Sequence, residues 1–149
     1  MLMPIPDAAT MSRRSQIVAD LRQIVAGEGV IDAEEERRAY ECDALNIYRA
    51  LPMVVVLPST VAEVAAVMRY CQANAIKIVP RGAGTGLSGG ALPLEDGVLL
   101  GMAKFNKVLD IDTANRCARV QPGAPLVKRR PFRQLGSLQV RGLSMTTRW

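Results

Sequence analysis

The sequence predicts an α+β fold in which a small mixed sheet is flanked by helices. Two observations support this. A strand-like run, a helical run and a second strand-like run follow one another before a glycine-rich loop, and residues 107–120 then alternate as a β-hairpin does. The 149 residues suit one domain, and a hydrophobic content of 49% is enough for a packed core. We therefore expect one small domain with a glycine-rich connection between two of its strands.

The first predicted element is an amphipathic helix at 15–26, with Gly27 as its stop signal. Its apolar residues recur at helical spacing and share one face: Ile17, Val18, Leu21, Ile24 and Val25. The segment 32–40 is acidic and then basic, an order that suits a helix dipole and allows Glu34 to pair with Arg38 at i+4. We interpret this second segment as a solvated face rather than a site.

A strand, a helix and a second strand are predicted at 53–57, 60–74 and 77–79. Thr60 and Glu63 match a capping box at the start of the helix, so we give them a structural role. Four residues at helical spacing are expected on its buried face: Val64, Val67, Met68 and Cys71. The order of the elements predicts a parallel pair of strands joined by a right-handed crossover.

Further strands are predicted after the glycine-rich loop. The apolar run 98–100 is typical of a buried strand. The segments 107–112 and 116–120 alternate between apolar and polar residues around the turn 113–115, as the two strands of a hairpin do.

The glycine-rich loop is the most informative feature of the chain, because five glycines occur within the nine residues 82–90. Glycine accepts positive φ and has no Cβ, so successive N–H groups can turn inward and form a concave anion site. A pyrophosphate suits such a site. The loop therefore predicts binding of a dinucleotide.

The segment 84–89 also matches G-x-G-x-x-G, the fingerprint of the Rossmann fold, but the context differs. That fold needs a helix opening at the loop and an acidic residue about 20 positions later for the ribose. Here Pro93 and a turn-like Glu-Asp-Gly precede the next strand. A P-loop is excluded because no Gly-Lys-Ser/Thr follows the glycines. What remains is phosphate binding by loop amides between two strands.

Three stretches resemble the FAD-linked oxidases and dehydrogenases with a PCMH-type (vanillyl-alcohol-oxidase-type) flavin domain. They are LPSTVAEV at 57–64, VPRGAGTGLSGG at 79–90 and VQPG at 120–123, and the match spans roughly residues 15–123. The nearest likeness is to the N-terminal part of glycolate oxidase flavoprotein subunits and D-lactate dehydrogenases. The resemblance implies the N-terminal portion of a PCMH-type domain, in a family that oxidises 2-hydroxy acids to 2-oxo acids.

By this resemblance the loop wraps the pyrophosphate of FAD, with Thr85 and Ser88 adding hydroxyl donors to the amides. The implied cofactor contacts are Pro80, Arg81, Gly82, Ala83, Gly84, Thr85, Gly86, Leu87, Ser88 and Gly89. Because the chain has no histidine, FAD cannot be attached through a histidyl link and is expected to be held non-covalently. Two alternatives stay open: Arg81 is either a phosphate partner or a surface charge paired with an acid, and the loop by itself could be only a flexible connection.

The absence of histidine also removes the commonest general base and metal ligand. Cys42, Cys71 and Cys117 are widely spaced and contain no C-x-x-C, so no zinc site or disulfide framework is indicated, and we expect reduced core thiols. No apolar run is long enough for a transmembrane segment, and the first residues lack the plan of a signal peptide. These observations predict a cytoplasmic protein without a metal site.

The sequence divides into an N-terminal extension at 1–14, a partial FAD-binding domain at 15–123 and an atypical basic tail at 124–149. The tail carries six basic residues and no acid, whereas residues 1–123 carry 13 basic and 14 acidic residues. Prolines and glycines interrupt the tail, so we expect it to be disordered and not to bind nucleic acid. It does not continue the family's pattern, which suggests a truncated gene product, frame-shifted after Gly123.

Two functions follow from the sequence. The first is an FAD-binding fragment of a glycolate- or D-lactate-type dehydrogenase or oxidase that lacks the catalytic half, so that no catalytic residue is assigned. FAD and other subunits of a glycolate-oxidase-like complex are then the expected partners. The second is a non-catalytic remnant or small anion-binding module, which holds no stable flavin because part of its cradle is missing. In either case we expect aggregation or a partner, because a partial domain leaves strand edges unpaired.

Overall fold

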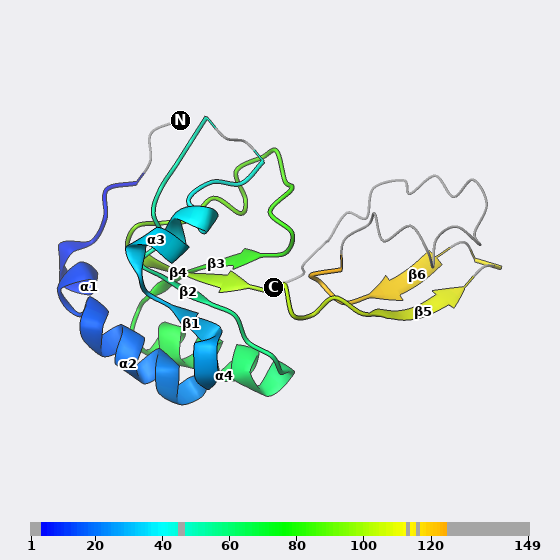
Figure 1. The fold of residues 1–149 in the computed structure, drawn as a ribbon, viewed down its shortest axis with the longest axis horizontal. Coiled ribbons are helices and arrows are strands. Elements are labelled where there is room, and N and C mark those ends of the chain that lie inside the picture. Colours follow the sequence, from blue (N-terminus) through cyan, green and yellow to red (C-terminus); the bar gives the residue numbers. More distant parts are fainter. Residues whose placement is uncertain (1–3, 45–46, 113, 116, 125–149) are drawn as a thin grey trace.

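A computed structural model of the chain describes residues 4–44, 47–112, 114–115 and 117–124. These residues form a four-stranded sheet of order β1-β2-β4-β3 and a separate two-stranded sheet, β5-β6 (Figure 1). The strands are β1 Val30–Ile31, β2 Val54–Val56, β3 Lys77–Arg81, β4 Gly97–Gly101, β5 Val108–Asp112 and β6 Cys117–Val120. The helices are α1 Ala8–Ser12, α2 Arg14–Ile24, α3 Glu34–Arg37 and α4 Val61–Ala73, with 3₁₀ turns η1 Gly27–Gly29 and η2 Arg38–Tyr40. The α+β class and the small mixed sheet with flanking helices are confirmed.

The strand order corrects one prediction from the sequence. β2 and β3 are parallel, as the strand-helix-strand order predicts, but they are not neighbours: each pairs with β4, which lies between them. β4 takes this central place because every one of its residues is buried, and a parallel strand covered on both faces is an uninterrupted apolar run. β1 joins the sheet antiparallel to β2.

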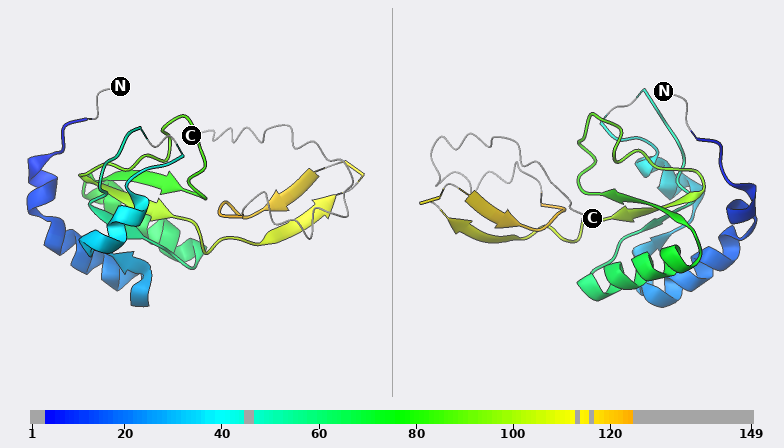
Figure 2. Two further views of the ribbon diagram at one scale, coloured as in Figure 1. Left: turned by 45° about the horizontal axis from the view of Figure 1, so that its top comes forward. Right: turned by 180° about the vertical axis from the view of Figure 1, so that it is seen from behind.

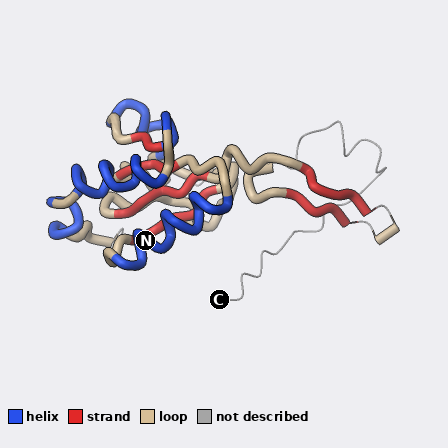
Figure 3. The backbone as a smooth tube through the Cα atoms, turned by 90° about the horizontal axis from the view of Figure 1, so that it is seen from below, coloured by secondary structure: helices blue, strands red, loops and turns tan. Residues whose placement is uncertain are grey.

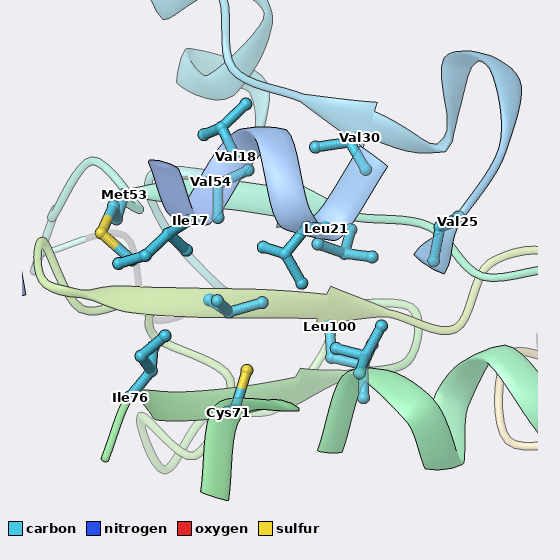
Figure 4. Packing of buried hydrophobic residues seen from close by; sticks show 13 residues of the cluster. Ile17, Val18, Leu21, Val25, Val30, Met53, Val54, Cys71, Ile76 and Leu100 are labelled. Carbon is cyan, nitrogen blue, oxygen red and sulfur yellow. The ribbon is translucent and has the colours of Figure 1, made fainter. Parts of the chain in front are cut away.

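The main core lies between the sheet and the helices α2 and α4, which lie on one side of the sheet (Figures 1 and 2). Side chains of α2, α4 and the strands meet there, among them Leu21, Val54, Cys71 and Leu100 (Figure 4). Met68 is the exception to the predicted buried face of α4. Its neighbour Val67 is fully buried, whereas Met68 is 41% exposed, because one further residue turns the side chain about 100° around the helix. A smaller cluster covers the other face of the sheet around Val55, Val79 and Leu99.

Two local predictions for the helices are confirmed and one is incomplete. The Thr60 hydroxyl accepts a bond from the Glu63 amide at 3.2 Å, and the Glu63 carboxylate accepts one from the Thr60 amide at 3.2 Å, which completes the capping box. Arg38 pairs with Glu34 at 2.7 Å on an exposed surface. Arg37 in the same segment is instead buried, because its guanidinium donates to the carbonyl of Pro52 at 2.5 Å.

Residues before the predicted helix at 15–26 also have structure. Helix α1 lies within the segment assigned to an N-terminal extension, and the Asp7 carboxylate caps it by accepting bonds from the amides of Ala9 and Thr10. α1 and α2 follow one another almost directly, separated by Arg13 alone. The predicted domain boundaries themselves remain predictions.

The hairpin β5-β6 is antiparallel, as predicted, with an irregular register between Val108 and Asp110. It projects away from the four-stranded sheet in every view (Figures 1, 2 and 3). None of its described residues is buried. The predicted basic tail lies outside the described residues, apart from Ala124. Within the described ranges, no helix is both long and apolar enough to cross a membrane.

Candidate functional site

The candidate site lies at the carboxyl ends of the three parallel strands. Because β2, β3 and β4 run in the same direction, the residues that follow them meet at one edge of the sheet. The glycine-rich loop 82–90 leaves β3 at this edge. In open α/β sheets, ligands bind in the crevice outside the carboxyl ends of the strands. The loop therefore occupies the position where the sheet favours a ligand.

Hydrogen bonds and close contacts bring the three stretches of the family resemblance together at this edge. The amide of Met102, just after β4, donates to the carbonyl of Arg81 at 2.8 Å. Lys104 donates to the Ser59 hydroxyl at 3.2 Å, which links the ends of β4 and β2. A Cβ added to Gly82 would lie 2.9 Å from the carbonyl oxygen of Pro122, so the third stretch touches the start of the loop. The stretches are therefore neighbours in space although they are far apart in the sequence.

The backbone of the loop is suited to an anion. Gly84 and Gly89 have φ values of +70° and +73°, which only glycine adopts without strain. A Cβ added to Gly86 would meet no atom within 4 Å, so this part of the backbone faces open space. Among the residues that the structure describes, no partner accepts a hydrogen bond from the amides of residues 82–88. These free N–H groups fit the negatively charged oxygens of a pyrophosphate.

Side chains of the loop point mostly outward. Thr85, Leu87 and Ser88 are exposed, with Leu87 at 71%. Thr85 and Ser88 are therefore accessible as hydroxyl donors to a ligand at the loop, as the sequence predicts for a bound cofactor. Pro80 is also exposed at the end of β3.

Arg81 has partners that the sequence did not predict. Its Nη1 donates to the carbonyl oxygens of Cys42 at 2.7 Å and Tyr40 at 3.1 Å. Its guanidinium also lies over the Tyr40 ring, 5.8 Å from the ring centroid. Within the described ranges no acidic residue forms an ion pair with Arg81, so the alternative of a surface charge paired with a nearby Glu or Asp is not found there.

Asp96 lies directly before β4, at the amino edge of the sheet and not at the loop, and sequence reasoning missed its partners. Its carboxylate is 3% exposed and accepts bonds from Lys77 Nζ at 2.6 Å and from the Asp7 amide at 2.8 Å. Burial raises the pKa of Asp96, but the bonds from Lys77 and the amides outweigh this and leave the pKa below its ordinary value. The sequence signal was an acid directly before a buried strand, which was interpreted only as part of a turn.

The cysteines differ in their surroundings, and in the described part of the chain only Cys42 contacts the start of the loop, through its carbonyl oxygen. The thiols are free, and burial raises the pKa of Cys71 to about 11. Cys117 is exposed on the hairpin, so the prediction that all three are core thiols is wrong for this residue. A hollow of about 490 Å³ lies elsewhere, and its lining shares no residue with the loop: Arg22, Gly27, Glu28, Val30, Ile31, Asp32 and Glu36.

Comparison with known proteins agrees with this geometry. The family described as FAD binding domain matches residues 52–129. The glycolate oxidase subunit GlcD of Escherichia coli (strain K12) is 50% identical over 110 residues, which cover 74% of this chain and 22% of that protein. The D-lactate dehydrogenase of Anaerostipes hadrus is 37% identical over 103 residues, covering 68% of this chain and 22% of that protein. The chain thus spans about one fifth of the length of these relatives.

Solved structures agree on the fold. The chain is similar to p-cresol methylhydroxylase with substrate bound, with a TM-score of 0.68 and 23% identity over 93% of this chain and 27% of that one. It is also similar to the 4-ethylphenol oxidase from Gulosibacter chungangensis in its isoeugenol complex. There the TM-score is 0.66 and the identity 22%, over 83% of this chain and 24% of that one. At such identities the likeness shows a shared fold.

Proposed function

Because the chain belongs to the FAD binding domain family, we propose that its glycine-rich loop holds FAD non-covalently for a dehydrogenase or oxidase of 2-hydroxy acids. FAD is the cofactor that defines the family. The class of substrate rests on the relatives, which include a glycolate oxidase subunit and a D-lactate dehydrogenase. Because the chain spans about one fifth of their length, the reaction is proposed for the whole protein and not for these residues alone.

One observation carries the proposal: a run of backbone amides without a partner among the described residues lies at the carboxyl edge of a parallel sheet. Backbone N–H groups that converge on open space bind phosphate oxygens without needing a positively charged side chain. The hydroxyls of Thr85 and Ser88 are exposed on the same loop. Bound FAD would supply the hydride-accepting group, while this chain supplies binding and orientation.

The family resemblance implies ten contacts along the loop, Pro80–Gly89. We divide their roles by what the structure offers. The amides of 82–88 bind the pyrophosphate, and Thr85 and Ser88 add side-chain donors. Gly86 allows close approach because no neighbour within 4 Å would meet a Cβ at this position. No catalytic role is proposed for any residue of the chain.

A second candidate function is an anion-binding module without stable flavin, and it rests on what FAD requires besides the loop. FAD requires cover for its isoalloxazine and adenine as well as for its pyrophosphate. The cavity of about 490 Å³ lies away from the loop and cannot provide this cover. In this case the loop would still bind pyrophosphate, but flavin would be lost during purification.

Retention of flavin separates the two functions. The chain is incubated with excess FAD, free cofactor is removed, and the visible spectrum is compared with those of Gly86→Ala and Gly90→Ala. Both glycines face open space, so neither substitution should change the melting temperature, but only Gly86 lies among the proposed contacts. We expect Gly86→Ala to weaken FAD binding about tenfold, or about 1.4 kcal/mol, and Gly90→Ala to bind like the parent chain.

Equal retention by the parent chain and Gly86→Ala would contradict the proposed contacts. No retained flavin in the parent chain would favour the anion-binding module. Inorganic pyrophosphate, titrated under the same conditions, then tests whether the loop binds the anion alone.

The proposal also covers the partners of the protein and its location in the cell. Other subunits of a glycolate-oxidase-like complex are the proposed partners, since the most similar relatives include a protein described as a subunit. We also propose a cytoplasmic location, because the odd number and wide spacing of the three cysteines do not suit the disulfide framework of a secreted protein.

A further inference from the structure

We propose that Arg81 is a positioning residue, which fixes the shape of the glycine-rich loop instead of binding phosphate itself. The inference rests on the proposed function, in which this loop is the FAD site. Arg81 is the last residue of β3, so its side chain leaves the sheet where the loop begins. Its partners decide between the two roles.

One nitrogen of the guanidinium, Nη1, donates to backbone carbonyls on another segment. Nη1 donates to the carbonyl oxygen of Tyr40, the last residue of η2, at 3.1 Å. It also donates to that of Cys42, just beyond η2, at 2.7 Å. The Tyr40 ring lies beneath the guanidinium, with its centroid 5.8 Å from Cζ. Arg81 therefore ties the start of the loop to the segment 40–42.

The loop in turn folds closely around this side chain. A Cβ added to Gly84 would lie 2.5 Å from Nη2 and 2.6 Å from Nε of Arg81. Gly84 has a φ of +70°, which also excludes most other residues. The backbone at Gly84 thus lies directly against Nε and Nη2 of Arg81, and a larger residue would push the two apart.

These contacts require arginine in particular. The planar guanidinium can donate to two carbonyls, stack on a ring and support a backbone at the same time. A lysine at this position keeps the charge but loses the planar group. If Arg81 instead bound phosphate directly, a lysine could replace it, because a lysine ammonium also binds phosphate. Arg81→Lys therefore separates a positioning role from a ligand role.

The first readout uses no ligand. Backbone ¹⁵N relaxation is measured for residues 40–44 and 82–88 in the ligand-free chain and in Arg81→Lys. If Arg81 fixes the loop, order parameters in both segments fall from about 0.85 towards 0.6 in the variant, because the contact that joins them is lost. If Arg81 served only to bind phosphate, Arg81→Lys would leave the order parameters of the ligand-free chain unchanged. Arg22→Lys is the matched control, since Arg22 on α2 forms an ion pair with Asp32, outside both measured segments.

The second readout is FAD affinity. A positioning role predicts that Arg81→Lys and Arg81→Gln weaken binding equally, by about tenfold, because charge is not what is lost. A ligand role predicts that Arg81→Lys retains most of the affinity and Arg81→Gln does not. Tyr40→Leu keeps the backbone carbonyls and removes only the ring, so it replaces the Arg81 variants if these fail to fold. We expect Tyr40→Leu to lower the order parameters of the same two segments less than Arg81→Lys does.

The outcomes are distinguishable from failure of the proposed function. If the parent chain retains no FAD, the relaxation experiment still tests Arg81. Unchanged order parameters in Arg81→Lys and Tyr40→Leu would overturn the inference, as would rescue of FAD affinity by lysine alone.

Discussion

Glycines at the candidate site differ in what surrounds them, and this decides which of them the fold requires. A Cβ added to Gly123 would lie 2.0 Å from the carbonyl oxygen of Met102 and 3.0 Å from that of Phe105. Both neighbours are backbone atoms that cannot move aside, and the Gly123 amide donates to Phe105 at 2.8 Å. Gly123 therefore has a structural role, whereas Gly86 faces open space.

We predict that Gly123→Ala destabilises the chain by about 3 kcal/mol, because overpacking against backbone forces the turn 121–124 away from the sheet. Urea unfolding followed by circular dichroism measures the change in the midpoint. Gly86→Ala is the control and should unfold like the parent chain. Equal midpoints for the parent chain and Gly123→Ala would contradict the close contact.

Arginines show why single residues at the site were hard to predict. Arg37 stands among charged residues, which favours a solvated position, whereas Arg81 follows an apolar run at the start of the glycine-rich loop. Their partners are the backbone carbonyls of Pro52 for Arg37 and of Tyr40 and Cys42 for Arg81, from segments that come near only after folding. The sequence gives no periodic signal for such a contact. The glycines and hydroxyls of the loop could be predicted, because their spacing is local.

At the scale of elements, helices α2 and α4 are joined by a polar contact beside the apolar core. The Tyr70 hydroxyl donates to Asp20 Oδ2 at 2.7 Å. Burial, together with the Asp20 carboxylate, raises the pKa of Tyr70 to about 12. A raised pKa means that the folded state favours the protonated phenol.

This contact predicts a pH dependence at the alkaline end. The stabilisation is complete below the ordinary tyrosine pKa near 10 and is lost as pH rises towards 12, since the unfolded state releases its proton first. Tyr70→Phe should lower the free energy of unfolding by about 1 kcal/mol at pH 7 and flatten the profile between about pH 10 and 12. Urea unfolding at several pH values measures both effects. If the free energy of unfolding of Tyr70→Phe fell as steeply between pH 10 and 12 as that of the parent chain, other groups would cause the loss of stability at alkaline pH.

Most elements could be predicted from the sequence because each has a local signal. The capping box of α4 and the two strands of the hairpin are set by neighbouring residues and were found at the expected places, whereas α2 ends at Ile24, two residues before its predicted end. The order of the strands could not be predicted from such local signals. Whether β2 pairs with β3 or β4 depends on which strand can be covered on both faces, and this is a property of the assembled sheet. Asp96 was missed for the same reason, since its partners come from β3 and the N-terminal segment.

At the scale of the whole molecule, the hairpin β5-β6 is the least supported part of the described chain. It projects from the body (Figure 3), and its residue Leu109 is 53% exposed. An isolated two-stranded hairpin is marginally stable in water, and its edges can pair with another chain. The matched segment makes up about one fifth of the length of these relatives.

We therefore expect the isolated chain to self-associate as its concentration rises. Leu109→Lys should reduce this association, because a charge on the strand opposes pairing between copies. Light scattering coupled to size-exclusion chromatography measures the mass, with Met68→Lys as a control for an exposed apolar residue away from the hairpin. A monodisperse monomer of the parent chain at high concentration would show that the hairpin needs no partner.

The central claim is that backbone amides of the glycine-rich loop bind the pyrophosphate of FAD. The most direct test is a ¹H–¹⁵N correlation spectrum of the labelled chain during titration with FAD. We expect the largest chemical-shift changes at the amides of residues 82–88, with smaller changes at Thr60 and Gly123 on the same edge of the sheet. Shifts concentrated instead around the hollow near Arg22 and Gly27, or no shifts at millimolar FAD, would contradict it.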